Sequence, residues 1–249
     1  MPSHLRTIFL NGQSVSIKYV EHRRAKRLIL RIETGGRHIR LTAPPGVSFE
    51  RKTAFIMRHK SWLEAKMRQL HQDIFSDLQG DKTTGKFFYG TFFPFLGKNY
   101  RIFHSSEPID GYLFREEGLF FSCSERMLGP KLQNFLEEQG KVYIRSLIED
   151  YLRGYSFERC YKKFKLKDMK TRWGSCSLTG SLSFSWRIMM APKEIVSYLV
   201  AHEVAHLKEM NHGKKFWQLC EILCPNAQEY RKWLRINGSK LHYYDFTEH

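Results

Sequence analysis

The chain has 249 residues, of which 42% are hydrophobic and 27% are charged, a globular composition that excludes wholesale disorder. No run of about 18 apolar residues could span a membrane, and the N-terminus lacks the apolar core and small-residue cleavage site of a secretory signal. The 5 cysteines are scattered and odd in number, which excludes a disulfide framework and predicts a reducing, cytoplasmic setting.

The positive charge is concentrated toward the N-terminus. The net charge is +16, and residues 1–75 hold 15 Lys and Arg against 5 Asp and Glu. This excess favours encounters with nucleic acid, anionic surfaces or acidic proteins. A solvated basic face is the simpler interpretation, because no recognised nucleic-acid-binding motif accompanies the charge.

Hydrophobic periodicity and turn residues outline the first two thirds of the chain. The expected elements are a hairpin over 28–43 turning at Gly35-Gly36, a helix over 48–72, a polar linker over 76–86, short aromatic strands over 87–122 and a helical region over 129–164 with a weak point at Gly154. We expect an α+β protein of two parts. Residues 1–125 form a β-rich, basic region, and residues 126–249 form the catalytic region.

In the last third of the chain, hydrophobic residues first recur with the period of a strand and then with the period of a helix. Residues 181–190 place Leu182, Phe184, Trp186 and Ile188 on one face and mostly serines on the other, which predicts a half-buried strand. Further predicted helices are 193–210, opening after Pro192, then 216–223, and one through 230–234 that ends near Gly238.

The predicted helix over 193–210 carries the motif His202-Glu203-x-x-His206. Residues four apart lie on the same face of a helix, so both imidazoles can bind one tetrahedral ion. Glu203 lies about 100° around the helix axis from His202, beside the open position of the metal rather than among its ligands. The pattern predicts a catalytic zinc ion with Glu203 as the general base. Two satisfied core histidines are the alternative.

A catalytic zinc site usually has three protein ligands. His212 gives the spacing H-x₃-H-x₅-H found in metzincins, although this chain has Glu209 where their pattern has glycine. Glu221 or Glu229 on the following helices is the alternative third ligand, and we favour His212.

At this point the sequence resembles the YgjP-like family of predicted metal-dependent hydrolases, which is related to SprT-like and Wss-type metallopeptidases. The matching pieces are Arg172-Trp173-Gly174-Ser175-Cys176, Trp186-Arg187, Pro192, the HExxH motif, Asn211-His212 and Phe216-Trp217, with RRAKRLILRI, APPGV, the Trp62 helix and FPFLGKNYRI upstream. The resemblance covers roughly residues 20–236. It departs at Ser185, where the family often has Asn, and at Gly213, often Ser. It implies a zincin-like core, a peptidase-type site and His212 as third ligand.

We therefore expect a zinc metallopeptidase with one Zn²⁺ per chain, held by His202, His206 and His212, in which Glu203 activates zinc-bound water to attack a peptide bond. The substrate is a peptide or protein that pairs with residues 181–190 as an edge strand. Oxyanion donors to consider are Tyr198, Arg172 and Tyr230. Cys176, Cys220 and Cys224 are weaker candidates for nucleophile or ligand. The alternative function is a basic, nucleic-acid-associated binding module with a structural zinc. No membrane association is expected, and the sequence does not indicate an oligomeric state.

Overall fold

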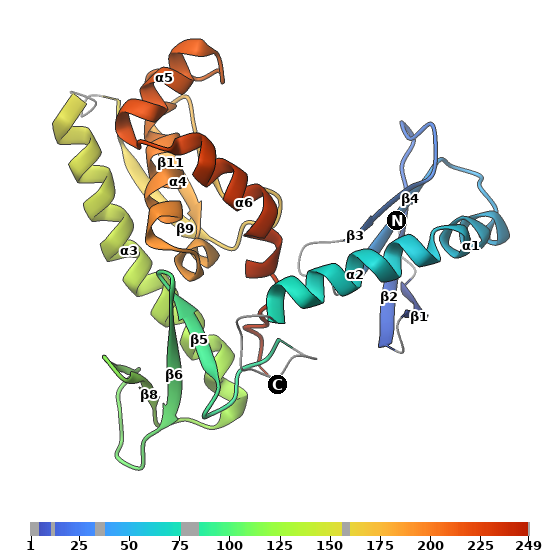
Figure 1. Ribbon diagram of the computed structural model, residues 1–249, viewed down its shortest axis with the longest axis horizontal. Coiled ribbons are helices and arrows are strands. Elements are labelled where there is room, and N and C mark those ends of the chain that lie inside the picture. The colour runs from blue at the N-terminus through green and yellow to red at the C-terminus, as the bar shows by residue number, and fades with distance from the viewer. Residues whose placement is uncertain (1–4, 11–12, 33–37, 76–84, 156–159, 249) are drawn as a thin grey trace. The chain divides into compact units, whose positions relative to one another are not determined.

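The computed structural model describes residues 5–10, 13–32, 38–75, 85–155 and 160–248. The chain divides into two compact units, Met1–Leu78 and Gln79–His249 (Figure 1). Helices and mixed sheets make up both units, so the protein is α+β as expected. The expected turn at Gly35-Gly36 and most of the expected linker over 76–86 lie outside the described residues.

The first unit is a four-stranded sheet with two helices. Its elements are β1 (Leu5–Leu10), β2 (Gln13–Glu21), β3 (Ile29–Ile32), β4 (His38–Ala43), α1 (Phe49–Arg58) and α2 (Lys60–Phe75). The strand order is β1-β2-β4-β3, with β2 and β4 parallel and the other pairs antiparallel. The expected hairpin is the antiparallel pair of β3 and β4.

One hydrophobic core joins this sheet to its helices. Alternate residues of the strands, such as Ile17 and Leu41, pack with Ile56 of α1 and Leu63 of α2, and all four are at most 1% exposed. The single helix predicted over 48–72 is divided at His59, whose backbone N–H bonds back to the carbonyl of Ile56 and closes α1. The hydrophobic pattern continues through both helices because both cover this core, so periodicity alone did not reveal the break.

The second unit contains two small sheets and the remaining helices. Its elements are β5 (Phe92–Phe95), β6 (Lys98–His104), β7 (Leu113–Arg115), β8 (Gly118–Phe121), η1 (Glu125–Met127), α3 (Leu128–Tyr155), β9 (Lys163–Lys167), β10 (Gly174–Cys176), β11 (Ser181–Ser185), η2 (Trp186–Met190), α4 (Lys193–Ala205), α5 (Lys214–Leu223) and α6 (Ala227–Leu241). The sheet orders are β5-β6-β8-β7 and β10-β11-β9.

The expected boundary at residues 125 and 126 falls inside this second unit. Aromatic side chains of β5 pack against the long helix α3, with ring centroids 5.9 Å apart for Phe93 and Phe135 and 4.9 Å apart for Phe95 and Phe135. The backbone N–H of Leu96 also bonds to the carbonyl of Met189 at 2.8 Å. The aromatic strands therefore share one core with the C-terminal helices.

The three-stranded sheet has β11 at its centre. β11 pairs antiparallel with β10 and parallel with β9, so both of its edges are used. The strand predicted over 181–190 ends at Ser185, and 186–190 form the 3₁₀ turn η2. Trp186, Ile188, Met189 and Met190 are all buried there, which is why the apolar pattern continued past the end of the strand.

The helices that follow also differ from the sequence expectations in their limits. α3 ends at Tyr155, and the last two residues of the helix expected over 129–164 belong to the strand β9 instead. α4 ends at Ala205 rather than at residue 210. α6 continues through Gly238, where a Cβ would lie 2.9 Å from Nε1 of Trp173, so glycine allows a close approach there instead of ending the helix.

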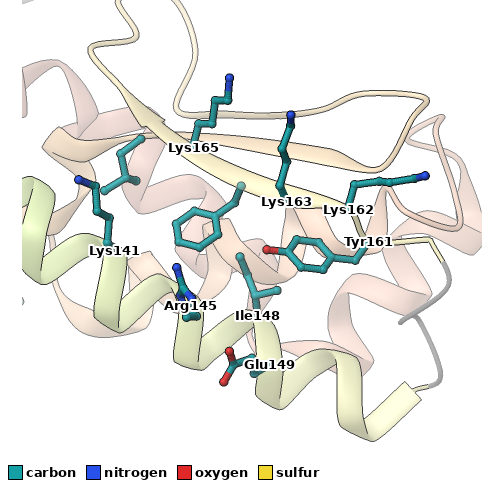
Figure 2. A pocket seen from close by; sticks show the side chains of 10 residues that line it. Lys141, Arg145, Ile148, Glu149, Tyr161, Lys162, Lys163 and Lys165 are labelled. Carbon is teal, nitrogen blue, oxygen red and sulfur yellow. The ribbon is translucent and has the colours of Figure 1, made fainter.

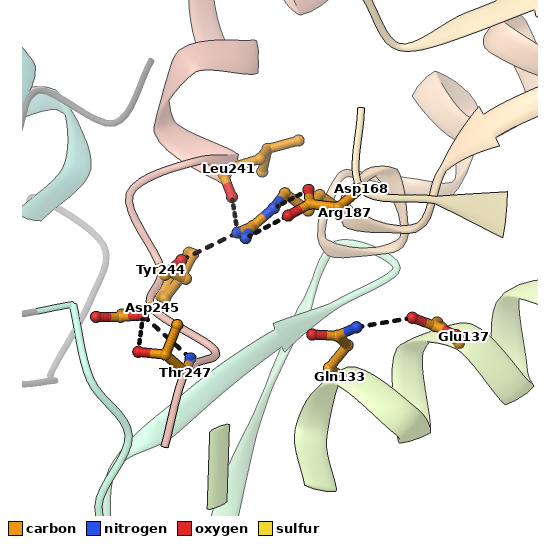
Figure 3. Close-up of polar contacts among 8 residues, drawn as sticks. All are labelled: Gln133, Glu137, Asp168, Arg187, Leu241, Tyr244, Asp245 and Thr247. Atoms are coloured by element: carbon orange, nitrogen blue, oxygen red, sulfur yellow. Dashed lines mark hydrogen bonds and ion pairs between the residues drawn. The ribbon is translucent and has the colours of Figure 1, made fainter. Parts of the chain in front are cut away.

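Arg187 ties η2 to the C-terminal segment (Figure 3). Its Nε donates to Oδ1 of Asp168 at 2.8 Å, and its Nη1 donates to the backbone carbonyl of Tyr244 at 3.0 Å. The guanidinium also lies 4.5 Å from the ring centroid of Trp186 and 5.0 Å from that of Phe246. The guanidinium of Arg187 thus contacts two aromatic rings and donates hydrogen bonds to a carboxylate and a backbone carbonyl. These contacts fix the segment that precedes α4.

Candidate functional site

The helix α4 supplies two histidines at the point where it ends. His202 lies in its last turn and His206 is the C-cap residue. After the cap the chain turns, and Nδ1 of His206 donates to the backbone carbonyl of Glu209 at 3.0 Å. This bond fixes the ring and leaves Nε2 of His206 for another partner. This turn after His206 returns the chain toward the end of α4, so His212 can lie beside the other two histidines although position 209 is not a glycine.

The three imidazoles converge as the sequence predicts. One ligand atom from each of His202, His206 and His212 lies within 4.8 Å of the others, so the group could hold a metal ion. Nε2 of His212 and Nε2 of His202 are 3.1 Å apart. Two nitrogens bound to one tetrahedral zinc at about 2.0–2.1 Å would be separated by about 3.4 Å. The donor set and its spacing therefore fit a zinc ion.

Phe216 of α5 packs against all three imidazoles. The ring centroid of Phe216 is 4.9 Å from that of His202, 4.4 Å from that of His206 and 4.7 Å from that of His212. Phe216 is fully buried, and the ring of Trp217 stacks on His212 at 5.8 Å. The ligands are thus held by packing as well as by the helix, and α5 completes the site.

The surroundings favour the neutral form of His202 and His206, which is the form that binds a metal. Burial, together with the positive charges that His206, His212 and Arg231 can carry, lowers the pKa of His202 to about 3. Burial likewise lowers the pKa of His206, opposed by its hydrogen bond to the backbone. The cation of Arg231 lies over Trp217, 4.5 Å from its ring centroid.

Glu203 is on the same helix but outside the ligand group. It is 4% exposed and packs against Gly174 of β10, where a Cβ would meet its carboxylate. Burial raises the pKa of Glu203 to about 8, and the charge of Arg172 opposes this rise. A buried carboxyl group with a pKa near neutrality, beside three imidazoles, can accept and return a proton.

The alternative candidates lie elsewhere or have other roles. Glu221 accepts a hydrogen bond from the backbone N–H of Gln228 at 3.2 Å, across the turn between α5 and α6. Glu221 and Glu229 are not in the ligand group found among the described residues. Burial raises the pKa of Cys220 to about 12 and that of Cys176 to about 11, so both thiols stay protonated at neutral pH and are poor nucleophiles or ligands.

Two parts of the site were not evident from the sequence. The strand β11 has partners on both sides, so the expectation that residues 181–190 form a substrate-binding edge is wrong. The edge of this sheet that contacts α4 is β10, next to Glu203. The sequence signal was Gly174 itself, because a glycine inside a strand often marks a close approach of another group.

An α+β protein with three convergent imidazoles and a buried carboxyl group belongs, as a class, with the metal-dependent hydrolases. The model of one family, described as YgjP-like, metallopeptidase domain, matches residues 26–237. The chain belongs to this YgjP-like family, a family of metal-dependent peptidases.

Solved structures show weaker likenesses. The metallopeptidase zymogen abylysin of Pyrococcus abyssi is 22% identical, with a TM-score of 0.35 over 41% of this chain and 99% of that one. The zymogen jannalysin of Methanocaldococcus jannaschii is also 22% identical, with a TM-score of 0.34 over 38% of this chain and 95% of that one. No curated protein matches the chain. Among the described residues, no helix has the length and apolar character needed to cross a membrane.

Proposed function

We propose that the chain is a zinc-dependent peptidase in which His202, His206 and His212 hold one Zn²⁺ and Glu203 is the general base. The observation that carries the proposal is the arrangement on α4. Three imidazole nitrogens lie within 4.8 Å of one another, and a buried carboxyl group stands one residue from the first of them without joining the group. A structural zinc is usually closed by four Cys or His ligands, and no fourth is in this group.

The proposed roles of the zinc ion and of Glu203 follow from this geometry. A bound zinc ion supplies a Lewis acid that makes water more acidic and polarises the substrate carbonyl. Glu203 takes a proton from the attacking water and delivers it to the leaving amine. A nearby divalent cation lowers the pKa of a carboxyl group, so the value of about 8 in the protein alone falls toward the range in which Glu203 is ionised at neutral pH.

The edge of β10 is the proposed place for the substrate backbone. β10 is at the end of its sheet, and Gly174 at its start contacts Glu203. An extended peptide that pairs with this edge by backbone hydrogen bonds would pass directly beside the proposed base. This assignment replaces β11, and it explains why the strand next to Glu203 carries a glycine, a serine and a cysteine rather than large side chains.

A cavity of about 420 Å³ extends from His206 to the turn between β10 and β11. Two of its lining residues are large hydrophobic side chains in contact with water, Leu178 at 88% and Met210 at 41% exposed, and Leu207 lines it as well. Exposed apolar side chains gathered beside a reaction centre are typical of a ligand site. We propose that this cavity receives an apolar side chain of the substrate.

Glu203→Gln tests the proposal. The substitution keeps the size of the side chain and removes the base, so zinc content should remain at one per chain while turnover on a cleaved peptide falls by about 10²–10⁴-fold. Gly213→Ala is the matched control for general damage to the site, because its Cβ would have no neighbour within 4 Å. A zinc-loaded Glu203→Gln variant that cuts as fast as wild type would falsify the role of Glu203.

The second candidate function is a binding module that holds nucleic acid, with the zinc as a structural ion. The observation that favours it is the exposed cluster Arg23, Arg24, Lys26 and Arg27, between β2 and β3 of the first unit. If this cluster binds DNA, affinity should fall steeply with salt and weaken when all four are neutralised. Equal binding by that variant excludes the cluster as the site.

The five cysteines are all unpaired, which supports a reducing compartment such as the cytoplasm.

A further inference from the structure

A second cavity, of about 540 Å³, lies between α3 and β9 (Figure 2). Five cationic side chains line it, Lys141 and Arg145 from α3 and three lysines from residues 162–165, against one acid, Glu149. None of the five forms an ion pair with any described residue. A cavity lined by one sign of charge, with apolar walls, concentrates anions.

The cavity runs along the edge of β9 rather than over one face of it. Successive residues of a strand point to opposite faces, yet the cavity is lined by Lys163, Phe164, Lys165 and Leu166 in sequence. The other edge of β9 is paired with β11. The cavity therefore follows the outer edge, where no backbone hydrogen bond to β9 is formed within the described parts of the chain.

The two sides of this edge differ in chemistry. Figure 2 shows Lys163 and Lys165 standing on the side of the strand away from α3, whereas Arg145 and Tyr161 lie between the strand and the helix. On that inner side Phe164 and Leu166 are partly buried, and the guanidinium of Arg145 lies 5.9 Å from the ring centroid of Phe164. A strand added here would have lysines beside one row of its side chains and apolar groups beside the other.

The lysine row lacks an anionic neighbour within the sheet. Lys163, Lys165 and Lys167 recur at every second residue, about 6.6 Å apart, and are exposed. Their partners across the sheet are Ser181, Ser183 and Ser185 on β11, which are neutral. The three positive charges lie on one face of the strand, so a ligand with several negative charges would be attracted to the whole row.

We propose that the outer edge of β9 is a docking site for an extended, acidic polypeptide segment in which acidic and apolar residues alternate. Its backbone pairs with the free edge of β9, its acidic side chains face the lysine row, and its apolar side chains face Phe164 and Leu166. The site lies on the opposite edge of the sheet from β10, so a bound segment leaves the proposed reaction centre open. A nucleic acid would use the charges but not the backbone edge, which is why a polypeptide fits better.

The test measures binding by fluorescence anisotropy with a labelled peptide that alternates Glu and Val. The full chain carries Glu203→Gln, so the probe stays intact and the result does not depend on the proposed peptidase function. The control probes are the same residues arranged as a Glu block and a Val block, the alternating peptide with N-methyl groups on every second residue, and a single-stranded oligothymidine.

The alternating peptide should bind, and Lys163→Glu with Lys165→Glu should weaken its affinity by about tenfold or more, since two exposed attractions become repulsions. The matched control, Lys232→Glu with Arg235→Glu on exposed positions of α6, makes the same change of charge and should leave the affinity within about twofold. Circular dichroism of each variant verifies that it is folded, and Lys163→Gln with Lys165→Gln should give an intermediate affinity.

Three results would overturn the proposal. Equal affinity in the lysine variant and its control would mean that β9 is not the site. If the block peptide or the N-methylated peptide bound as tightly as the alternating peptide, binding would depend on charge alone and no strand would be added to the sheet. Tighter binding of the oligothymidine through the same lysines would assign the edge to nucleic acid instead.

Discussion

Replacing Gly174 with alanine tests whether the position of Glu203 sets the rate of the proposed reaction. Gly174 has no unusual backbone conformation, so only space opposes a side chain there. A Cβ would lie 2.8 Å from both Cγ and Cδ of Glu203, and closer still to Oε1. Ordinary contacts begin at 3.4 Å, so the carboxyl group must move by at least the difference of 0.6 Å, and further at the oxygen.

A displacement of this size matters because proton transfer requires a short, aligned contact. A misplacement of about 1 Å can cost about 100-fold in rate. Gly174→Ala should therefore reduce kcat about 100-fold with little change in KM. The three imidazoles pack against Phe216, and the atoms nearest to the added Cβ all belong to Glu203, so zinc content should remain at wild-type level.

The assay pairs turnover of a cleaved peptide with zinc stoichiometry from elemental analysis. Gly213→Ala is the matched control, since its Cβ would have no neighbour within 4 Å and it is adjacent to the ligand His212. It should retain both zinc and turnover. The reasoning is refuted if folded Gly174→Ala is as fast as wild type, or if its loss of rate follows a loss of zinc.

Three further predictions concern the metal, the pH dependence and the packing. His206→Ala should lose most of its zinc in elemental analysis, because two imidazoles hold the ion poorly. In the metal-free protein, the pKa of Glu203 is raised to about 8 by folding from 4.5 in the unfolded chain, so its contribution to the free energy of unfolding should fall as pH rises through that window. The lowered pKa values of His202 and His206 act in the opposite direction in wild type and in Glu203→Gln alike, so the test is the difference between the two proteins. Urea unfolding at pH 5 and pH 8 should show wild type losing stability relative to Glu203→Gln; the same pH dependence in both would contradict the buried carboxyl group. Gly238→Ala should destabilise by about 1–3 kcal/mol through its clash with Trp173, whereas Gly154→Ala, with no neighbour within 4 Å, should stabilise by about 0.5–1 kcal/mol, both measured by thermal denaturation.

The sequence predicted the convergence of the three imidazoles because its geometry is mostly local. A spacing of four on a helix brings His202 and His206 together whatever the rest of the chain does, and His212 needs only a turn after the helix cap. The contact of Gly174 with Glu203 depends instead on how β10 is placed against α4. A single sequence does not encode that register in any short pattern, so the edge strand was assigned to β11 in error.

Burial explains the remaining differences between the elements predicted from the sequence and those of the structure. Apolar residues continue from β11 into η2 because both are buried, and alternation could not mark where the strand ended. The boundary between the two compact units, after Leu78, falls in the polar stretch predicted as a linker over 76–86, whereas the domain boundary expected at residues 125 and 126 does not coincide with it. The strands after this stretch pack on Phe135 of α3, a contact that spans more than thirty residues of sequence.

The three imidazoles and Glu203 differ in how far along the chain the residues around them lie. His202, His206, His212 and Phe216 lie within one short stretch, and the hydrogen bond that orients His206 comes from the same stretch. The setting of Glu203 comes from a distant strand. A peptide spanning α4 and α5 would therefore contain all three proposed ligands and Phe216 without the sheet. Under the proposed function such a fragment would bind zinc but lack the strand that positions Glu203, so metal binding and hydrolysis would be separated in it.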